Sequence, residues 1–328
     1  MNIARFLAAS AIGASALAAG VANALPPSEY DASVLNIYYG GATATDNILE
    51  NNFQLIGPGI CAPGTISVYR VSASNRNQRV VFCRVTSAQV PGFPDAPGQK
   101  VAFHKESIGG SSNGVVPLID QSQLEFFNMA AAASCTTVTP VAATTNLNAY
   151  TNYTGCPDNT ILAVPNGGIS DVEPRLSFPA PSAAGIASLT STVGLDIIFG
   201  VPVTENLYRA LQVAQGYIDN DTARNPTAKC VGGIDAPGCA PSLTRSQVRG
   251  LYTGATGDWS QLFVGNGTAT AEDGTSLTAV PGVTAPINTA VAGGPVADSR
   301  VFICRRVATS GTQAGTETYF LKQRCREG

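Results

Sequence analysis

The sequence has a single histidine, His104, and only 12% charged residues. One histidine cannot build a metal site with several imidazole ligands, and it weakens any scheme that needs a Ser-His-Asp triad. The 19 basic and 22 acidic residues give a formal net charge of −3, so electrostatic binding to nucleic acid is not expected. We assign His104 no catalytic role and expect it, with Lys105 and Glu106, to form an ion-paired strand end.

Apolar residues are plentiful by contrast, because 44% of the 328 residues are hydrophobic. A chain of this composition can bury a real core, and its length exceeds what one core usually serves. We therefore expect a folded protein of two lobes or domains rather than a disordered chain. The 34 glycines and 21 prolines indicate long loops.

The N-terminus carries the pattern of a secretory signal. A positively charged start at residues 1–5 precedes a short, alanine-rich apolar run, which ends at Ala22-Asn23-Ala24. This order predicts a signal peptide at 1–24, cleavage after Ala24, and export to the periplasm or the extracellular space. A membrane anchor is the alternative, although the apolar run is barely long enough to span a bilayer. The cleavage site has no cysteine, so we expect neither a lipid anchor nor membrane insertion of the mature chain.

All eight cysteines lie after the predicted signal, and an even number in an exported protein predicts disulfide bonds. Sequence alone does not fix their pairing. Sequential pairing is the simplest hypothesis, because each bond would then close one local loop. The pairs would be Cys61–Cys83, Cys135–Cys156, Cys230–Cys239 and Cys304–Cys325. A cysteine metal cluster is the competing idea, but the chain has no C-x-x-C motif, so we expect no metal and no cofactor.

Hydrophobic patterning predicts strands that alternate with helices. Strands are expected at 33–39, 66–71, 80–85, 100–104, 195–203 and 300–304. Helices are expected to begin near residues 45 and 114, and to occupy about 206–215, 242–252 and 316–322. Two segments, 129–160 and 264–297, are rich in small residues and are expected to be irregular excursions. The alternation predicts an α/β protein with a partly parallel sheet in each lobe.

Four glycine-rich turns are each expected where a strand leads toward a helix, at 40–43, 109–114, 169–171 and 306–312. In open α/β sheets the carboxyl ends of the strands converge on a ligand crevice, and glycine lets backbone N–H groups approach the ligand closely. Hydroxyl donors would come from Thr43, Ser111, Ser310 and Thr312, and a planar guanidinium from Arg306. Together these groups predict a cage for a small tetrahedral anion.

Asp171 discriminates among such anions. A carboxylate beside a bound anion is repelled unless the anion has a proton to donate. Phosphate at neutral pH keeps a P–OH group, whereas sulfate has none. An aspartate acceptor therefore favours phosphate and excludes sulfate, because sulfate leaves the buried acceptor unpaired.

Five motifs occur in the order found in one known family: Gly41-Ala42-Thr43, Gly110-Ser111-Ser112-Asn113-Gly114, Ser170-Asp171, Leu243-Thr244 through Gly254 and Trp259, and Arg306 followed by Ser310-Gly311-Thr312. They resemble the motifs of the phosphate-binding proteins of ABC transporters, which are periplasmic solute-binding proteins of type II. The resemblance implies a two-lobed α/β fold, with lobe I at 25–195 and lobe II at 196–328. It also implies seven phosphate contacts: Thr43, Ser111, Asp171, Arg306, Ser310, Gly311 and Thr312.

The sequence departs from the family pattern at three places. Asn113 stands where the family has a glycine in its second turn. The excursions at 129–160 and 264–297 are additions. The family also continues well beyond its Ser-Gly-Thr turn, whereas the chain here ends at residue 328, sixteen residues after Thr312. We therefore expect a second lobe that is shortened, or a chain that is a fragment.

Simpler roles compete for the same residues. Serines such as Ser111 and Ser310 commonly cap helices, and Asp171 could be an ordinary turn residue. Arg305 rivals Arg306 as the cation. Trp259 is expected to pack in a core or an interface rather than to carry a ligand.

The resemblance implies a monomeric solute-binding protein, not an enzyme, that closes two lobes around inorganic phosphate and delivers it to an ABC transporter permease. One alternative is a secreted or cell-surface protein that keeps the fold and has a structural or adhesive role. A secreted phosphatase is less favoured, since hydrolysis needs a nucleophile or a metal-bound water and the sequence shows neither a metal-ligand cluster nor a histidine base.

Overall fold

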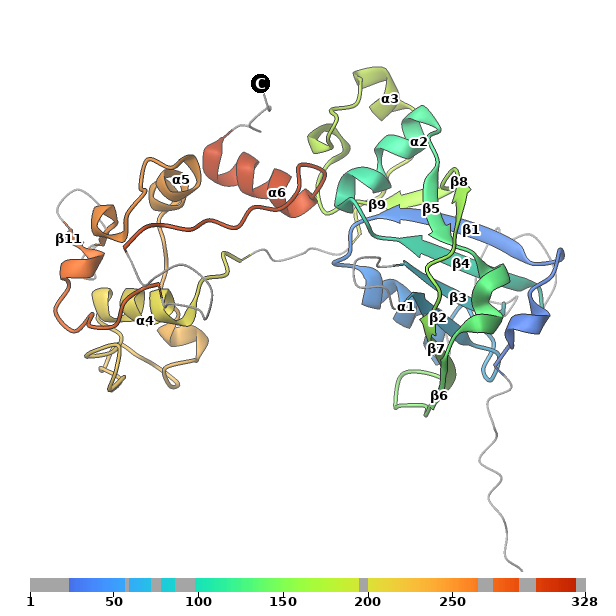
Figure 1. Ribbon diagram of the computed structural model, residues 1–328, viewed down its shortest axis with the longest axis horizontal. Helices are drawn as coiled ribbons and strands as arrows, with labels where there is room; N and C mark the ends of the chain where they lie inside the picture. The colour runs from blue at the N-terminus through green and yellow to red at the C-terminus, as the bar shows by residue number, and fades with distance from the viewer. Residues whose placement is uncertain are drawn as a thin grey trace, which may run out of the picture. The chain divides into compact units, whose positions relative to one another are not determined.

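The computed structural model describes residues 24–56, 59–71, 78–85, 98–194, 200–264, 274–288 and 299–322. The chain divides into two compact units. Unit 1 comprises Met1–Ser170 and Pro181–Leu189, and unit 2 comprises Asp171–Ala180 and Thr190–Gly328. The blue-to-green elements of Figure 1 belong to unit 1 and the orange and red helices to unit 2. The predicted signal peptide lies almost wholly outside the described residues.

Unit 1 is built on a mixed seven-stranded sheet with the order β6-β7-β2-β3-β4-β1-β9. Its strands are β1 Leu35–Gly41, β2 Ser67–Val71, β3 Gln78–Arg84, β4 Lys100–Glu106, β6 Thr137–Val141, β7 Tyr150–Cys156 and β9 Gly167–Ile169. The three strands β4, β1 and β9 are parallel neighbours, whereas β3 pairs with β2 and β4 in antiparallel fashion. A second, two-stranded sheet pairs β5 Leu124–Phe127 with β8 Thr160–Ala163. The α/β class is confirmed for this unit.

Successive side chains on a strand point to opposite faces of the sheet. Apolar residues pack on both faces of this sheet. On one face Phe53 of helix α1 (Asp46–Gln54) packs with Val81 and Phe103. On the other face Phe82 packs with Phe127 of β5. Unit 1 also contains these short helices: η1 Pro27–Glu29, η2 Gly110–Gly114, α2 Val116–Asp120, η3 Met129–Ser134 and α3 Ala183–Ala187.

The predicted strands at 33–39, 66–71, 80–85 and 100–104 are confirmed as β1 to β4, and the helices expected near 45 and 114 are α1 and α2. The prediction of an irregular excursion at 129–160 is wrong. This segment contributes β6 and β7 to the sheet, and β7 pairs in parallel with β2. The residues of β6 are almost all exposed, so they lack the alternating apolar pattern that identifies a strand in sequence.

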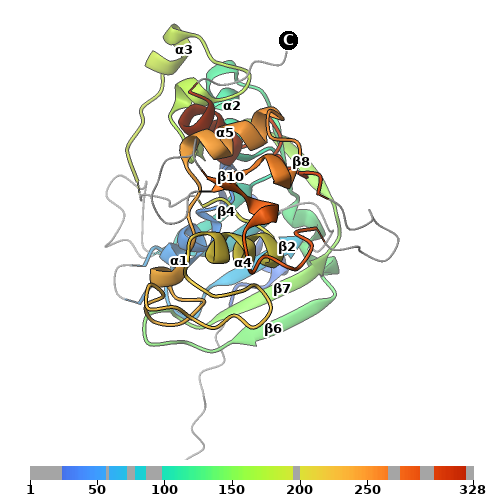
Figure 2. The same cartoon turned by 90° about the vertical axis from the view of Figure 1, so that its left-hand side faces the viewer.

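Unit 2 contains helices around a separate core. The longer helices are α4 Glu205–Ala214, α5 Arg245–Thr253, and α6 Gly311–Thr316, which continues as a π-helical turn Glu317–Leu321. The short helices are η4 Pro174–Leu176, η5 Pro237–Cys239, η6 Trp259–Gln261 and η7 Leu277–Ala279. Two short strands, β10 Phe263–Val264 and β11 Thr275–Ser276, pair with each other. Figure 2 shows α4 and α5 facing the viewer. Leu211 of α4 and Leu251 of α5 pack with Trp259, so the tryptophan is a core residue, as expected.

The helices predicted at 206–215 and 242–252 are confirmed, and the terminal helix begins earlier than expected, at Gly311. The strand predicted at 300–304 is wrong: Arg300 forms one isolated bridge with Asp258, and residues 301–304 are not in a strand. Residues 195–199 of the strand predicted at 195–203 lie outside the described residues, and 200–203 is not a strand. Within the described part of unit 2 the sheet is two-stranded and antiparallel, so the expected parallel sheet is absent there.

The described residues form three disulfide bonds: Cys61–Cys83, Cys135–Cys156 and Cys230–Cys239. They confirm three of the four predicted pairs, while the fourth involves Cys325, which lies outside the described residues. Disulfide bonds are typical of proteins that fold in an oxidising compartment.

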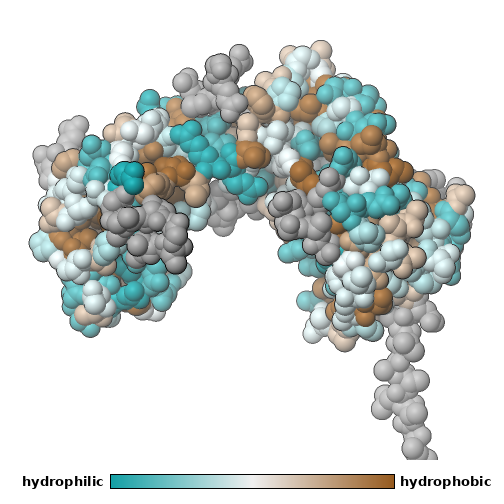
Figure 3. Space-filling model, in the orientation of Figure 1, coloured by the Kyte–Doolittle hydropathy of each residue, from teal (hydrophilic) through white to brown (hydrophobic). Residues whose placement is uncertain are grey.

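The surface mixes polar and apolar side chains, as Figure 3 shows for one face of the molecule. Large exposed apolar residues come from separate elements, for example Leu162 on β8 and Phe263 on β10. In the described ranges, no helix is both long enough and apolar enough to cross a bilayer.

Candidate functional site

Three strand ends of unit 1 meet at one edge of the sheet. Because β4, β1 and β9 are parallel, their carboxyl ends are aligned, with Gly40 opposite Glu106 and Gly41 opposite Ile169. The amide of Ala42 donates a hydrogen bond of 2.8 Å to the carbonyl oxygen of Ile169, which fastens the turn after β1 to the end of β9. This edge is where ligands bind in open α/β sheets.

Glycine makes the close approach at this edge possible. A β-carbon added at Gly41 would lie 2.0 Å from the Ile169 carbonyl oxygen, and Gly41 has a φ of +114°. A β-carbon at Gly114 would lie 2.3 Å from the same oxygen, and one at Gly168 would lie 2.0 Å from the Gly114 carbonyl oxygen. Contacts this short exclude any side chain, so glycine alone allows the three turns to come together. We call Gly41, Gly114, Gly168 and Ile169 the glycine cluster.

Thr43 and Ser111 stand on two of these turns. Thr43 is the second residue after β1 and is half-buried, and Ser111 lies on η2 and is buried. Asn113, which replaces a glycine of the family motif, donates to the Ile108 carbonyl oxygen at 2.8 Å and so closes the turn that carries Ser111. The predicted turns at 40–43, 109–114 and the start of 169–171 therefore lie together in unit 1.

A buried ammonium group lies beneath two of these turns. Lys105, near the end of β4, is 1% exposed. Its Nζ donates to the carbonyl oxygens of Gly41 at 2.9 Å and Ala42 at 3.3 Å, and to Ser107 Oγ at 2.7 Å. It also donates to the Glu106 carbonyl oxygen at 3.1 Å and forms an ion pair with Asp46 at 3.3 Å. Lys105 is thus joined to the turn before Thr43 and to the turn before Ser111.

Asp46 and Lys105 belong to a larger set of charges between α1 and the sheet. Arg79 on β3 pairs with Asp46 and with Glu50, each at 3.2 Å, and Arg70 on β2 also pairs with Glu50. Three cationic side chains therefore face two buried carboxylates, and we call these five residues the α1 charge cluster. The carboxylate of Glu106 is also buried and interacts with Lys105, so the cations and carboxylates here balance in number.

Lys105 acts as a cation here and not as a base. Burial lowers its pKa, and the charge of Asp46 opposes that shift. Four oxygen atoms share the three protons of Nζ, Asp46 forms an ion pair with it, and Ser107 Oγ in turn donates to the Asp46 carboxylate at 2.9 Å. This polarity fits an ammonium beside a carboxylate. Ser107 is 3% exposed, so the Ser107–Lys105 pair has neither a free base nor an accessible nucleophile.

His104 is not part of an ion-paired strand end, and that prediction is wrong. It is buried among aromatic side chains, with its ring centroid 4.6 Å from that of Tyr38, and its Nε2 hydrogen-bonds Asn36 Oδ1 at 2.9 Å. Burial lowers the pKa of His104 to about 3, so the imidazole is neutral at physiological pH. Glu106 is also buried, and its carboxylate accepts a hydrogen bond from the Ile108 amide at 2.5 Å.

The other five predicted contacts belong to unit 2. Asp171 is half-buried and is the second residue after β9, so the same strand end leads into it. Ser310 is the N-cap of α6, and its Oγ accepts a hydrogen bond of 3.5 Å from the Gln313 amide. Gly311 and Thr312 form the first turn of that helix.

The two arginines differ in their surroundings. Arg305 donates to the carbonyl oxygen of Tyr252 on α5. The side chain of Arg306 is exposed, and its backbone amide donates to Gln313 Oε1 at 3.2 Å, which ties it to α6. The segment after Asp171 packs on the same helix, since Val172 Cγ1 lies 4.0 Å from the position of a β-carbon at Gly315.

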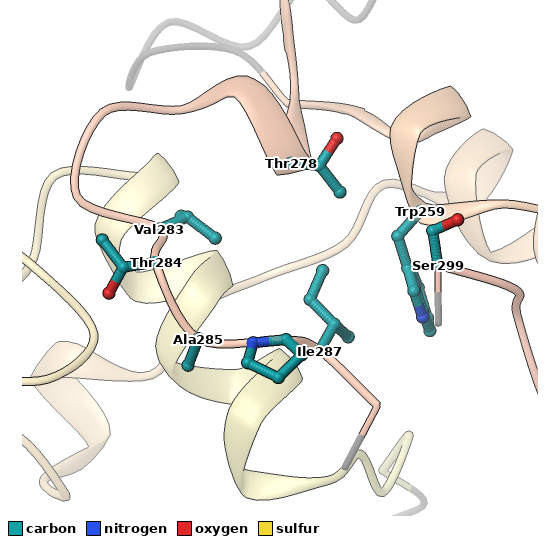
Figure 4. Close-up of a pocket in the computed structure, with 8 residues that line it drawn as sticks. Trp259, Thr278, Val283, Thr284, Ala285, Ile287 and Ser299 are labelled. Atoms are coloured by element: carbon teal, nitrogen blue, oxygen red, sulfur yellow. The ribbon is translucent and has the colours of Figure 1, made fainter. Parts of the chain in front are cut away.

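A pocket of about 310 Å³ lies elsewhere in unit 2. Figure 4 shows Val283 and Thr284 across the pocket from Trp259 and Ser299. Its lining residues are Trp259, Thr278, Val283, Thr284, Ala285, Pro286, Ile287 and Ser299. None of these side chains is charged, and none is a predicted phosphate contact.

Sequence reasoning found the glycine turns but missed the α1 charge cluster. One signal in the sequence indicated the position of Lys105. Phe103 faces α1, and residues two apart on a strand point to the same face, so Lys105 is expected to face α1 as well. Comparisons of the chain with protein-family models, curated proteins and solved structures found no match.

Proposed function

We propose that this chain is an exported solute-binding protein that captures inorganic phosphate without changing it chemically. The observation that carries the proposal is the meeting of three glycine-built strand ends, with Thr43 and Ser111 on the turns and the ammonium of Lys105 beneath them. A small anion is bound most effectively by fixed donors at short range, which need no rearrangement on binding.

The donor types suit phosphate. Hydroxyl and backbone N–H groups are neutral donors to an anion, and the Asp46 carboxylate near the strand ends is paired with Lys105 and Arg79. Asp171 accepts the remaining proton of the ligand, which sulfate lacks. The resemblance assigns the guanidinium of Arg306 and the Ser310-Gly311-Thr312 turn to the same ion. The exposed side chain of Arg306 leaves its planar fork accessible to two phosphate oxygens.

The disulfide bonds and the signal-like N-terminus support export to the periplasm or the extracellular space. In that compartment a phosphate-binding protein would act as a monomer that delivers its ligand to an ABC transporter permease. The chemistry required of it is capture and release, and the buried Ser107–Lys105 pair gives no alternative basis for hydrolysis.

Equilibrium dialysis of the exported protein with labelled phosphate tests the proposal. We expect saturable binding of one phosphate that excess sulfate does not displace. Ser111→Ala removes one hydroxyl donor and is expected to weaken binding about ten-fold. Ser122→Ala is the matched control, because Ser122 is an exposed serine of the same unit outside the glycine cluster.

Two results would contradict the proposal. One is the absence of phosphate binding by the folded wild-type protein. The other is an equal loss of phosphate binding in the Ser111 and Ser122 variants, which would show that binding does not depend on the strand ends.

A further inference from the structure

We propose that Lys105 is the positioning residue of the anion site in unit 1, and that its ammonium neutralises buried carboxylates that would otherwise repel dianionic phosphate more strongly than monoanionic phosphate. The inference rests on the proposed function for its ligand, but the positioning role belongs to the ligand-free protein. The family resemblance assigns no contact to Lys105.

Lys105 holds the turn that carries Thr43. Its Nζ contacts the carbonyl oxygens of Gly41 and Ala42, the two residues directly before Thr43. It also pairs with Asp46, whose backbone amide donates to the Thr43 carbonyl oxygen at 3.1 Å. The turn that carries Thr43 is therefore held to Lys105 on both sides of Thr43.

The same ammonium holds the second turn. Ser107 Oγ accepts from Nζ at 2.7 Å, and the Ser107 carbonyl oxygen accepts from the Gly110 amide at 3.4 Å. Ser111 is the next residue and lies on η2. One side chain thus fixes the spacing between the turns of Thr43 and Ser111, which come from two different strands.

Burying the ammonium of Lys105 has a free-energy cost. Moving a charged ammonium out of water is strongly unfavourable unless its protons find acceptors. Lys105 meets this condition with four oxygen acceptors and an ion pair with Asp46. An apolar side chain of the same length would leave the Gly41 and Ala42 carbonyls and the Asp46 carboxylate without this donor. The turns would then lose their common anchor.

The charge of Lys105 also matters for the anion site. The titratable and charged groups that face Lys105 are Asp46 on α1, Arg79 on β3 and Glu106 on its own strand. Glu50 pairs with Arg79 and with Arg70, so three carboxylates, Asp46, Glu50 and Glu106, match the three cations in number. Without the ammonium of Lys105 one negative charge is left uncompensated, and salt screens it poorly because it is buried. Its repulsion doubles when the ligand charge rises from −1 to −2.

The central experiment measures phosphate affinity across the pH range in which the monoanion becomes the dianion, in wild type and in two lysine variants. Lys105→Met is expected to weaken binding about ten- to hundred-fold and to flatten the pH profile, because the dianion loses more than the monoanion. Lys100→Met is the matched control. Lys100 lies on the same strand at its opposite end and pairs with Glu29 and Asp31. It is expected to bind like wild type at every pH.

A milder variant keeps the charge and loosens the contact. Ser107→Ala removes one acceptor of Lys105 and is expected to weaken binding several-fold while the pH profile keeps its wild-type slope. A role limited to general stability would not separate the two profiles in this way. If Lys105→Met does not fold, the Ser107 variant alone decides the positioning claim.

Amide hydrogen exchange in the ligand-free proteins separates this inference from the proposed function. Both the Lys105 and the Ser107 variants are expected to exchange faster at residues 42–46 and 108–114, and the Lys100 variant is not. If wild type binds no phosphate, the proposed function fails while this exchange result still tests the anchor. Wild-type affinity, pH profile and exchange in Lys105→Met would overturn the inference. Equal weakening for both phosphate forms would overturn its charge component.

Discussion

The glycine cluster allows a prediction in which steric overlap and backbone strain are measured separately. At Gly114 an added β-carbon would lie 2.3 Å from the Ile169 carbonyl oxygen and 2.7 Å from two further Ile169 backbone atoms, with no left-handed φ. At Gly64 the reverse holds, because φ is +78° and no atom lies within 4 Å. At Gly41 both apply, with a contact of 2.0 Å and a φ of +114°. Alanine at these three positions therefore isolates each effect and then combines them.

The expected magnitudes follow from these geometries. Gly64→Ala should cost about 1 kcal/mol of unfolding free energy, the usual cost of a left-handed residue with a β-carbon. Gly114→Ala should cost about 1–3 kcal/mol or more, because the overlap involves backbone atoms that cannot rotate away. Gly41→Ala should cost the most, about 3–5 kcal/mol, if strain and overlap add. We also expect phosphate affinity to fall in the variants at Gly41 and Gly114 but not at Gly64.

The assay uses two probes of urea unfolding. Trp259 is the only tryptophan and is buried in the core of unit 2, so its fluorescence reports on unit 2. Far-ultraviolet circular dichroism also detects the sheet of unit 1. The three substitutions should shift the circular-dichroism transition and leave the Trp259 transition in place. Wild-type stability of Gly114→Ala would refute the claim that the strand ends are in contact through glycine.

Two further predictions concern single titratable residues. Asp171→Asn should weaken phosphate binding and relax the exclusion of sulfate, since the amide no longer demands a proton from the ligand; unchanged selectivity in a competition assay would count against this role. Burial lowers the pKa of His104 to about 3 in the fold, against an ordinary value of 6.5, so between these two pH values only the unfolded state gains the proton. The stability from neutral His104 is therefore complete above pH 6.5 and is lost by up to about 1.4 kcal/mol per pH unit below it. Urea unfolding at pH 7 and pH 5 should show a smaller loss in His104→Gln than in wild type, and equal losses would contradict the assignment.

Local signals in the sequence predicted the elements that local forces determine. The buried strands β1 to β4 are apolar runs, and α5 begins at a capping box in which Thr244 and Gln247 bond each other's backbone amides. Such patterns lie within a few residues and need no knowledge of neighbours in space.

Errors occurred where distant partners decide the structure. The strand β6 is exposed and contains Pro140, and its place in the sheet depends on pairing with β7, which in turn pairs with β2 some eighty residues earlier in the sequence. Residues 301–303 are a short apolar run, Val-Phe-Ile, as a buried strand would have. However, only Val301 and Ile303 pack on the core of unit 2, while Phe302 is exposed, and this segment pairs with no strand in the described residues. An apolar run predicts burial, but strand pairing requires a partner.

The candidate site divides in the same way. Its glycine turns are contiguous in sequence and were recognisable as motifs. The carbonyl oxygens of Ala42 and Gly41, which accept hydrogen bonds from Lys105, lie 63 and 64 residues before it in the sequence. No local pattern indicates contacts at that separation. The charge cluster was therefore visible only once α1 and the sheet were placed together.

The observed cap at Ser310 bears on the choice between a structural and a binding role for the hydroxyl residues. Ser310 Oγ accepts a hydrogen bond from the Gln313 amide, which uses a lone pair of the hydroxyl. An anion would use the other part of the group, the O–H donor, because a hydroxyl carries one donor and two acceptor lone pairs. Capping also fixes the side chain near the first turn of α6, so the donor is held in place before a ligand arrives. Helix capping by Ser310 is therefore compatible with the proposed phosphate binding, because it holds the donor in place before a ligand arrives.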